Sequence, residues 1–123
     1  MRTFRVLDAE TGRCLLSDVE EAEGVVERFL GLMGRRGLQP QAGLHLPRCS
    51  SIHTCFMLFP IDVVYLDRAK VVKKIVAGMK SWRLSWCPGA DSVLEAAAGW
   101  AQKVGLAEGA QVAFEDSEPG ALG

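Results

Sequence analysis

The chain has 123 residues, of which 49% are hydrophobic and 24% charged, and its net charge is −1. This length fits one domain that buries a core without disulfides or metals, and the near-neutral charge provides no basic field for nucleic acid or anionic lipid. No run approaches the roughly 18 apolar residues of a membrane span, and no signal-peptide core precedes Asp8, so we expect a cytoplasmic protein with reduced cysteines and no nucleic-acid or membrane partner.

The first predicted elements are a hairpin and a helix. Residues 3–7 alternate and residues 14–17 return as a second strand, with Gly12 available for the turn between them. Apolar residues at helical spacing over residues 25–33 predict a helix that ends near Gly34.

Short strands dominate the rest of the chain. Strands are predicted at residues 52–59, 61–66, 71–76, 93–96 and 112–115, with a break at Pro60, a turn at 67–70 and a short helix over 99–104 that Gly105 closes. We therefore predict a mainly β (α+β) fold, a compact small β-barrel or sandwich of short strands with one or two short helices. It forms a single domain over residues 1–115, and residues 116–123 form a flexible acidic tail rich in Gly and Pro.

Four blocks of sequence carry a family resemblance. Residues 28–35 read RFLGLMGR and residues 52–67 read IHTCFMLFPIDVVYLD; the third block is WRL at 82–84, and the fourth is VLE at 93–95 with AG at 98–99 and GL at 105–106. With these blocks the chain resembles, over residues 25–112, the family known as domain of unknown function 192, or uncharacterised protein family 0127. It departs from the family pattern at Ser81, which replaces a usual proline, and at Ala96 and Ala97, which replace Leu-Pro. The resemblance implies a compact mainly β fold with small helices and no established activity.

His53 is the sharpest candidate for chemistry. An imidazole has an unperturbed pKa of about 6.5, so it can act as acid, base or ligand near neutral pH. Cys49 lies four residues before His53 and Asp62 nine residues after it. Close in space, the three would form a nucleophile, a base and an orienting group. In the alternative interpretation His53 is a buried imidazole that bonds Asp62 or a backbone carbonyl, and regular alternation over residues 52–59 would leave it at least partly buried.

Two arginines and a tryptophan cluster are candidates for ligand binding. Arg28 and Arg35 are seven residues apart and would project from one face of the predicted helix as an anion clamp, or form structural ion pairs. Trp82 and Arg83, with Trp86 close by, would stack against a sugar or another planar ligand. The alternative role for Trp82 is to cover one end of the barrel.

Sequence signals for metals and common cofactors are weak. A zinc site from Cys49, His53 and Cys87 lacks the close-paired spacing of structural zinc sites. The chain has no glycine-rich phosphate loop, no Gly-x-Ser-x-Gly elbow and no His-Glu-x-x-His motif. We therefore predict no metal and no cofactor.

The leading hypothesis is a binding module for a small polar or anionic ligand, such as a saccharide. Its site would be a cleft lined by the polar and aromatic candidates of the family-like blocks: Arg35, His53, Thr54, Asp62, Trp82 and Arg83. One alternative is an enzyme that uses Cys49, or His53 activated by Asp62. The other is a purely structural or protein-interaction domain, and the sequence leaves the oligomeric state open.

Overall fold

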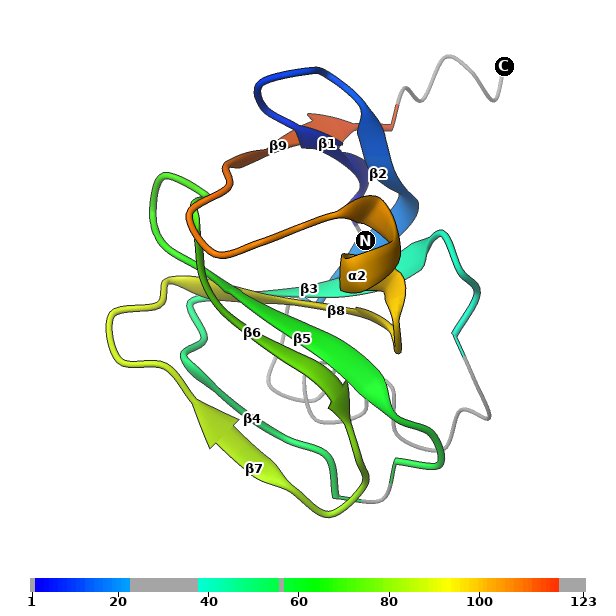
Figure 1. Ribbon diagram of the computed structural model, residues 1–123, viewed down its shortest axis with the longest axis vertical. Coiled ribbons are helices and arrows are strands. Elements are labelled where there is room, and N and C mark those ends of the chain that lie inside the picture. Colours follow the sequence, from blue (N-terminus) through cyan, green and yellow to red (C-terminus); the bar gives the residue numbers. More distant parts are fainter. Residues whose placement is uncertain (1, 23–37, 56, 118–123) are drawn as a thin grey trace.

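The computed structural model describes residues 2–22, 38–55 and 57–117 (Figure 1). Within them lie nine strands and one short helix: β1 Thr3–Asp8, β2 Cys14–Glu21, β3 Ala42–Pro47, β4 Ser51–His53, β5 Ile61–Leu66, β6 Val72–Met79, β7 Leu84–Trp86, β8 Ser92–Ala97, α2 Trp100–Val104 and β9 Val112–Asp116. The predicted hairpins at 3–17 and 61–76 are confirmed as β1–β2 and β5–β6.

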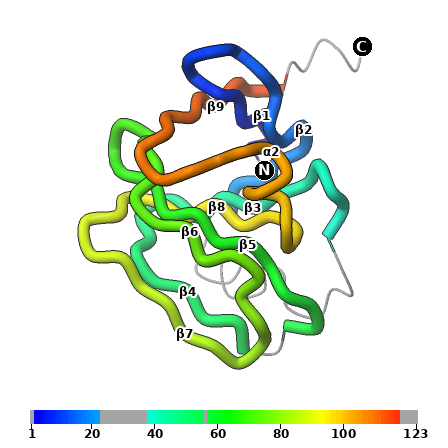
Figure 2. The backbone as a smooth tube through the Cα atoms, in the orientation of Figure 1, coloured from blue at the N-terminus to red at the C-terminus, as the bar shows by residue number. Residues whose placement is uncertain are grey.

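Seven strands form one curled sheet in the order β6-β5-β8-β3-β2-β1-β9 (Figures 1 and 2). Its two outer strands approach each other at one end, where Val72 N donates to Ala110 O at 2.8 Å and Val112 N donates to Lys70 O at 3.0 Å. The sheet is therefore a half-barrel whose outer strands are joined by backbone hydrogen bonds at this end. The predicted mainly β fold is confirmed.

The remaining two strands, β4 and β7, pair with each other in a separate antiparallel sheet. We call this pair the β4–β7 ladder. It lies against one face of the large sheet, because Ile52 of β4 and Cys87, which follows β7, pack in one apolar cluster with Val63 and Tyr65 of β5. The alternate β5 residues, such as Val64, belong to a second cluster.

The second cluster fills the concave side of the half-barrel. It joins Val64 to residues of β1, β2, β8 and β9 and to Trp100 and Ala101 of α2. Trp100 Nε1 donates to Leu15 O at 2.8 Å, which fixes the helix to the inside of the curled sheet. The predicted helix over 99–104 is confirmed, and left-handed glycines bound it, Gly99 with φ 88° and Gly105 with φ 75°.

One strand prediction is wrong. The apolar run 52–59 predicts a single strand, but β4 ends at His53 and belongs to the two-stranded sheet. The chain turns at Thr54, whose carbonyl accepts hydrogen bonds from Met57 N and Trp82 N at 3.2 and 3.1 Å. A run of apolar residues fits a tight buried turn as well as a strand, so composition alone did not separate the two.

Several predicted features fall outside or at the edge of the described residues. The predicted helix over 25–33, with Arg28, lies outside them, as do Arg35 and residues 118–123 of the predicted tail. The last strand, β9, runs to Asp116, one residue beyond its predicted end, and Arg2 Nε lies 2.7 Å from the Asp116 carboxylate.

Candidate functional site

Thr54 holds the loop between β6 and β7. Its hydroxyl donates to Lys80 O at 2.6 Å and accepts from Arg83 N at 2.9 Å, and its backbone N–H donates to Arg83 O at 2.9 Å. The side chain is fully buried. Thr54 was predicted to line the cleft, and the structure instead places its polar atoms on the backbone of residues 80–83.

Asp62 has a similar place on the other side of the sheet. Its Oδ1 accepts from Gly78 N at 2.8 Å and from Gly99 N at 3.2 Å, and its Oδ2 accepts from Ala101 N at 2.9 Å. The carboxyl group is fully buried. Asp62 therefore ties the end of β6 and the start of α2 to β5.

His53 and Cys49 face away from Asp62. His53 is exposed, so its predicted burial is wrong: β4 belongs to the outer ladder and turns this residue to solvent. Cys49 is buried, and its thiol donates to Ser51 O at 3.0 Å. Because Asp62 points to the face of β5 that α2 covers, while Cys49 packs in the cluster on the opposite face, the sheet separates the carboxylate from the thiol. The three candidate catalytic residues are not brought together.

Trp82 and Arg83 lie on the tight turn that leads into β7. Trp82 is 59% exposed and has a φ of 61°, a left-handed conformation that is uncommon for a residue with a side chain. Ser81, at the position where the family pattern has proline, donates through its hydroxyl to Met57 O at 2.6 Å. Hydrogen bonds to Ser81, Trp82 and Arg83 therefore fix the turn from several sides.

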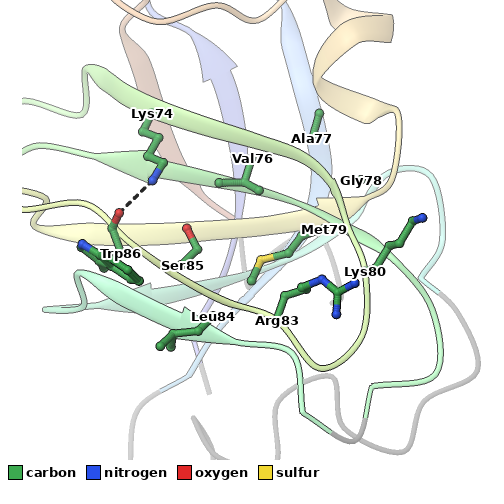
Figure 3. A pocket seen from close by; sticks show the side chains of 10 residues that line it. All are labelled: Lys74, Val76, Ala77, Gly78, Met79, Lys80, Arg83, Leu84, Ser85 and Trp86. Carbon is green, nitrogen blue, oxygen red and sulfur yellow. Dashed lines mark hydrogen bonds between the residues drawn. The ribbon is translucent and has the colours of Figure 1, made fainter.

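Next to this turn lies a groove between β6 and β7, with a volume of about 520 Å³ (Figure 3). Ten described residues line it: Lys74, Val76, Ala77, Gly78, Met79, Lys80, Arg83, Leu84, Ser85 and Trp86. Three of them are cations and none is acidic, although the whole chain has a net charge of −1. The groove is thus a local concentration of positive charge on a nearly neutral protein.

The groove combines this charge with apolar surface. Leu84 and Trp86 are 67% and 59% exposed, while Ser85 between them is buried and its Oγ accepts a 3.0 Å hydrogen bond from the Tyr65 hydroxyl. Burial raises the pKa of Tyr65, so the phenol stays protonated at neutral pH. Lys74 reaches across the groove and donates from Nζ to Trp86 O at 2.9 Å (Figure 3).

Of the predicted cleft residues that the structure describes, only Arg83 lines this groove. Thr54 and Asp62 support its walls from behind, because Thr54 bonds the backbone of Lys80 and Arg83, and Asp62 bonds Gly78. Sequence reasoning missed Lys74 and Lys80. The only signal was their place beside apolar residues, Lys74 within β6 and Lys80 directly after it. Lysines in such places are common on exposed edge strands, so they do not indicate a binding site.

The part of the chain that the structure describes has no group of three His, Cys, Asp or Glu side chains placed to hold a metal ion. Among the same residues, no helix is long and apolar enough to cross a membrane.

Comparison with known proteins identifies an uncharacterised family and two solved structures with the same fold. Residues 6–114 match the model of the DUF192 family, described as "Uncharacterized ACR". No curated protein matches significantly. A crystal structure from Sinorhizobium meliloti 1021, described as a "putative transcription regulator", has a TM-score of 0.78 at 22% identity and covers 92% of each chain. A protein of unknown function from Novosphingobium aromaticivorans DSM 12444 has a TM-score of 0.76 at 23% identity, with coverage of 90% of this chain and 83% of that one. At these identities the structures share the fold alone.

Proposed function

The chain belongs to the DUF192 family, and we propose that this member is a binding module whose groove between β6 and β7 takes a small anionic ligand with a ring or apolar face, such as a sugar phosphate or sugar acid. The observation that carries the proposal is the set of three cations beside an exposed tryptophan, with no acidic residue among the described lining residues.

The cations support a negatively charged ligand for a physical reason. Lys80 and Arg83 are both exposed and lie at the end of the groove nearest the turn, opposite Lys74 and Trp86 (Figure 3). Guanidinium and ammonium groups bind carboxylate and phosphate oxygens through charge-assisted hydrogen bonds, and arginine does so with two parallel donors. A neutral ligand would leave this excess of positive charge uncompensated.

The exposed indole supports a ligand with a flat or apolar face. The Trp86 side chain is more than half exposed, and its backbone carbonyl accepts a hydrogen bond from Lys74. Exposed large aromatic groups beside polar groups are typical of sites that stack a sugar ring or another planar group. Ring stacking and anion binding together would distinguish a sugar phosphate from a free inorganic anion.

The test compares charged and neutral sugars. We expect glucose 6-phosphate or glucuronate to raise the unfolding midpoint and neutral glucose to have little effect, because a ligand at 100 times its Kd adds about 2.7 kcal/mol of stability. Arg83→Ala and Trp86→Ala should each weaken binding, measured by isothermal titration calorimetry. Lys73→Ala is the matched control, because Lys73 is an exposed lysine of β6 that does not line the groove.

Two results would count against the proposal. One is binding that Arg83→Ala and Lys73→Ala weaken equally, which would reflect the total charge of the protein and not the groove. The other is the absence of a midpoint shift with every anionic sugar at millimolar concentration. In either case the third interpretation of the sequence, a purely structural or protein-interaction domain, would become the leading one.

A further inference from the structure

The strand β7 has a free edge, and the direction of that edge follows from its hydrogen bonds. Arg83 O accepts from Thr54 N and Cys87 N donates to Ser50 O, so both residues direct their backbone groups toward β4. Successive residues of a strand point their N–H and C=O groups to opposite edges. The backbone groups of Leu84 and Trp86 therefore point away from β4.

These groups point into the groove. The bond from Lys74 Nζ to Trp86 O crosses it, which places the Trp86 carbonyl on the groove side. Within the described residues β7 pairs with β4 alone, and β6, which forms the opposite wall, is the outermost strand of the large sheet. Beyond Val72, which bonds Gly109 and Ala110, no other described strand pairs with the outer edge of β6, so this edge and the free edge of β7 both border the groove.

Unpaired strand edges are binding sites for extended peptides. A peptide that adds as a strand gains main-chain hydrogen bonds, and the pockets for its alternate side chains set its specificity. Natural proteins usually protect such edges with charged residues, and lysine is a common choice. Lys74 takes this place here, because its ammonium group covers the carbonyl of Trp86.

We propose that the groove between β6 and β7 binds an extended acidic segment of a partner protein, which adds as a strand to the free edge of β7. This rests on the proposed function, because it assigns the anion-binding groove to carboxylates carried on a peptide backbone. The segment's N–H groups replace Lys74 at the Trp86 carbonyl, and the released ammonium group pairs with a carboxylate of the segment.

The charge and the apolar surface of the groove select the segment. Lys74, Lys80 and Arg83 match acidic side chains, with no acidic residue among the described lining residues to repel them. Leu84 and Trp86 offer exposed apolar surface beside the free edge, which suits the apolar side chains of an alternating segment. A small sugar could use the charges and the indole, but it would leave the unpaired backbone groups of Leu84 without partners.

The test uses a blocked hexapeptide that alternates Glu and Val, titrated by calorimetry and by tryptophan fluorescence. Two further peptides carry N-methyl groups on one or the other alternate set of residues, which removes the N–H donors along one edge without changing the charge. We expect the hexapeptide to bind and one N-methylated set to weaken binding at least about tenfold, because the strand pairs with β7 along one edge. The double variant Lys80→Glu with Arg83→Glu should abolish binding and unfold at the wild-type midpoint, and Lys73→Glu should bind normally.

The outcomes separate the strand proposal from the proposed function. If both N-methylated peptides bind as tightly as the unmodified one, strand addition is wrong and the groove binds by charge and apolar contact alone. If glucose 6-phosphate binds and the hexapeptide does not, the anion-binding groove stands and the peptide partner is wrong. If neither binds, both proposals fail together.

Discussion

The replacement of Asp62 by alanine should destabilise the protein by about 3 kcal/mol. The carboxylate accepts three backbone N–H groups, from Gly78, Gly99 and Ala101, and is itself fully buried. A buried donor left without an acceptor costs roughly 1–3 kcal/mol. Water can reach Gly78 and Gly99, which are exposed, but not Ala101, which is 3% exposed. The N–H of Ala101 therefore carries most of the cost, and the other two add smaller losses.

The assay is urea unfolding followed by circular dichroism, for Asp62→Ala and Asp62→Asn. Asparagine keeps one acceptor oxygen but turns an amide donor toward a backbone donor, so we expect a loss of roughly 2 kcal/mol. The matched control is Asp67→Ala at the other end of the same hairpin strand. Asp67 accepts from Ala69 N at 2.8 Å and Val71 N at 2.9 Å in the turn between β5 and β6, where water can replace part of this bonding, so we expect a loss of about 1 kcal/mol.

Equal losses for Asp62→Ala and Asp67→Ala would refute this account of Asp62. So would a stable Asp62→Ala protein that fails to bind an anionic ligand, because that result would return Asp62 to the ligand-contacting role that the sequence indicated. The expected pattern is a large loss of stability, with ligand binding altered only as far as the Gly78 wall of the groove moves.

Three further predictions concern stability. Burial raises the pKa of Glu95 to about 7 from its usual value near 4.5, so the unfolded chain loses this proton at lower pH than the folded one. Stability should therefore fall by roughly 3 kcal/mol as pH rises from about 4.5 to above 7, and Glu95→Gln should remove this slope in urea unfolding at pH 5 and pH 8. Thr54→Val keeps the shape of the side chain but leaves the buried partners at Lys80 and Arg83 unpaired, so we expect a loss of about 1–3 kcal/mol and weaker ligand binding by calorimetry. Gly43→Ala should lower the free energy of unfolding by about 1–3 kcal/mol, because the new Cβ on β3 would lie 2.9 Å from the backbone carbonyl oxygen of Glu95 on β8. If the variant unfolded at the same temperature as the wild type, the two strands would have moved apart to accept the methyl group at no cost, contrary to this prediction.

Much of the fold was predictable because it is encoded locally. The β1–β2 and β5–β6 hairpins each join strands that are adjacent in sequence, and their apolar alternation and turn residues are visible without any distant contact. The helix at 100–104 was also predictable, because Gly99 and Gly105 bound a short amphipathic stretch. In these elements the local preference and the final structure agree.

The β4–β7 ladder was not predictable by the same reasoning. Its strands have three residues each and are separated by the whole of β5 and β6. A strand that short carries no clear alternation, and its partner is set by tertiary packing on Tyr65 and Val63. The groove could not be predicted from the sequence for the same reason, because its two walls belong to different sheets and the groove forms only when the two sheets pack together.

The roles of the polar residues were confused for a related reason. A buried aspartate that holds backbone N–H groups and an aspartate that binds a ligand have the same sequence signature, a polar residue against an apolar strand. Asp62 and Thr54 were placed in the cleft on that signature, and the structure shows them one layer behind the groove. What separates the two roles is whether the protein's own backbone already uses the side chain's hydrogen-bonding capacity.

This arrangement gives a reason why buried polar residues lie so close to the proposed binding groove. A groove between two strand edges needs both edges to be held apart while their backbone groups stay unpaired, and hydrophobic packing alone does not set such a spacing. Thr54 fixes the β7 side through Lys80 and Arg83, and Asp62 fixes the β6 side through Gly78. Substitutions at these two residues should therefore change affinity together with stability, whereas Arg83→Ala should change affinity alone. That difference, measured on the same protein preparation, would separate residues that contact the proposed ligand from residues that position the groove.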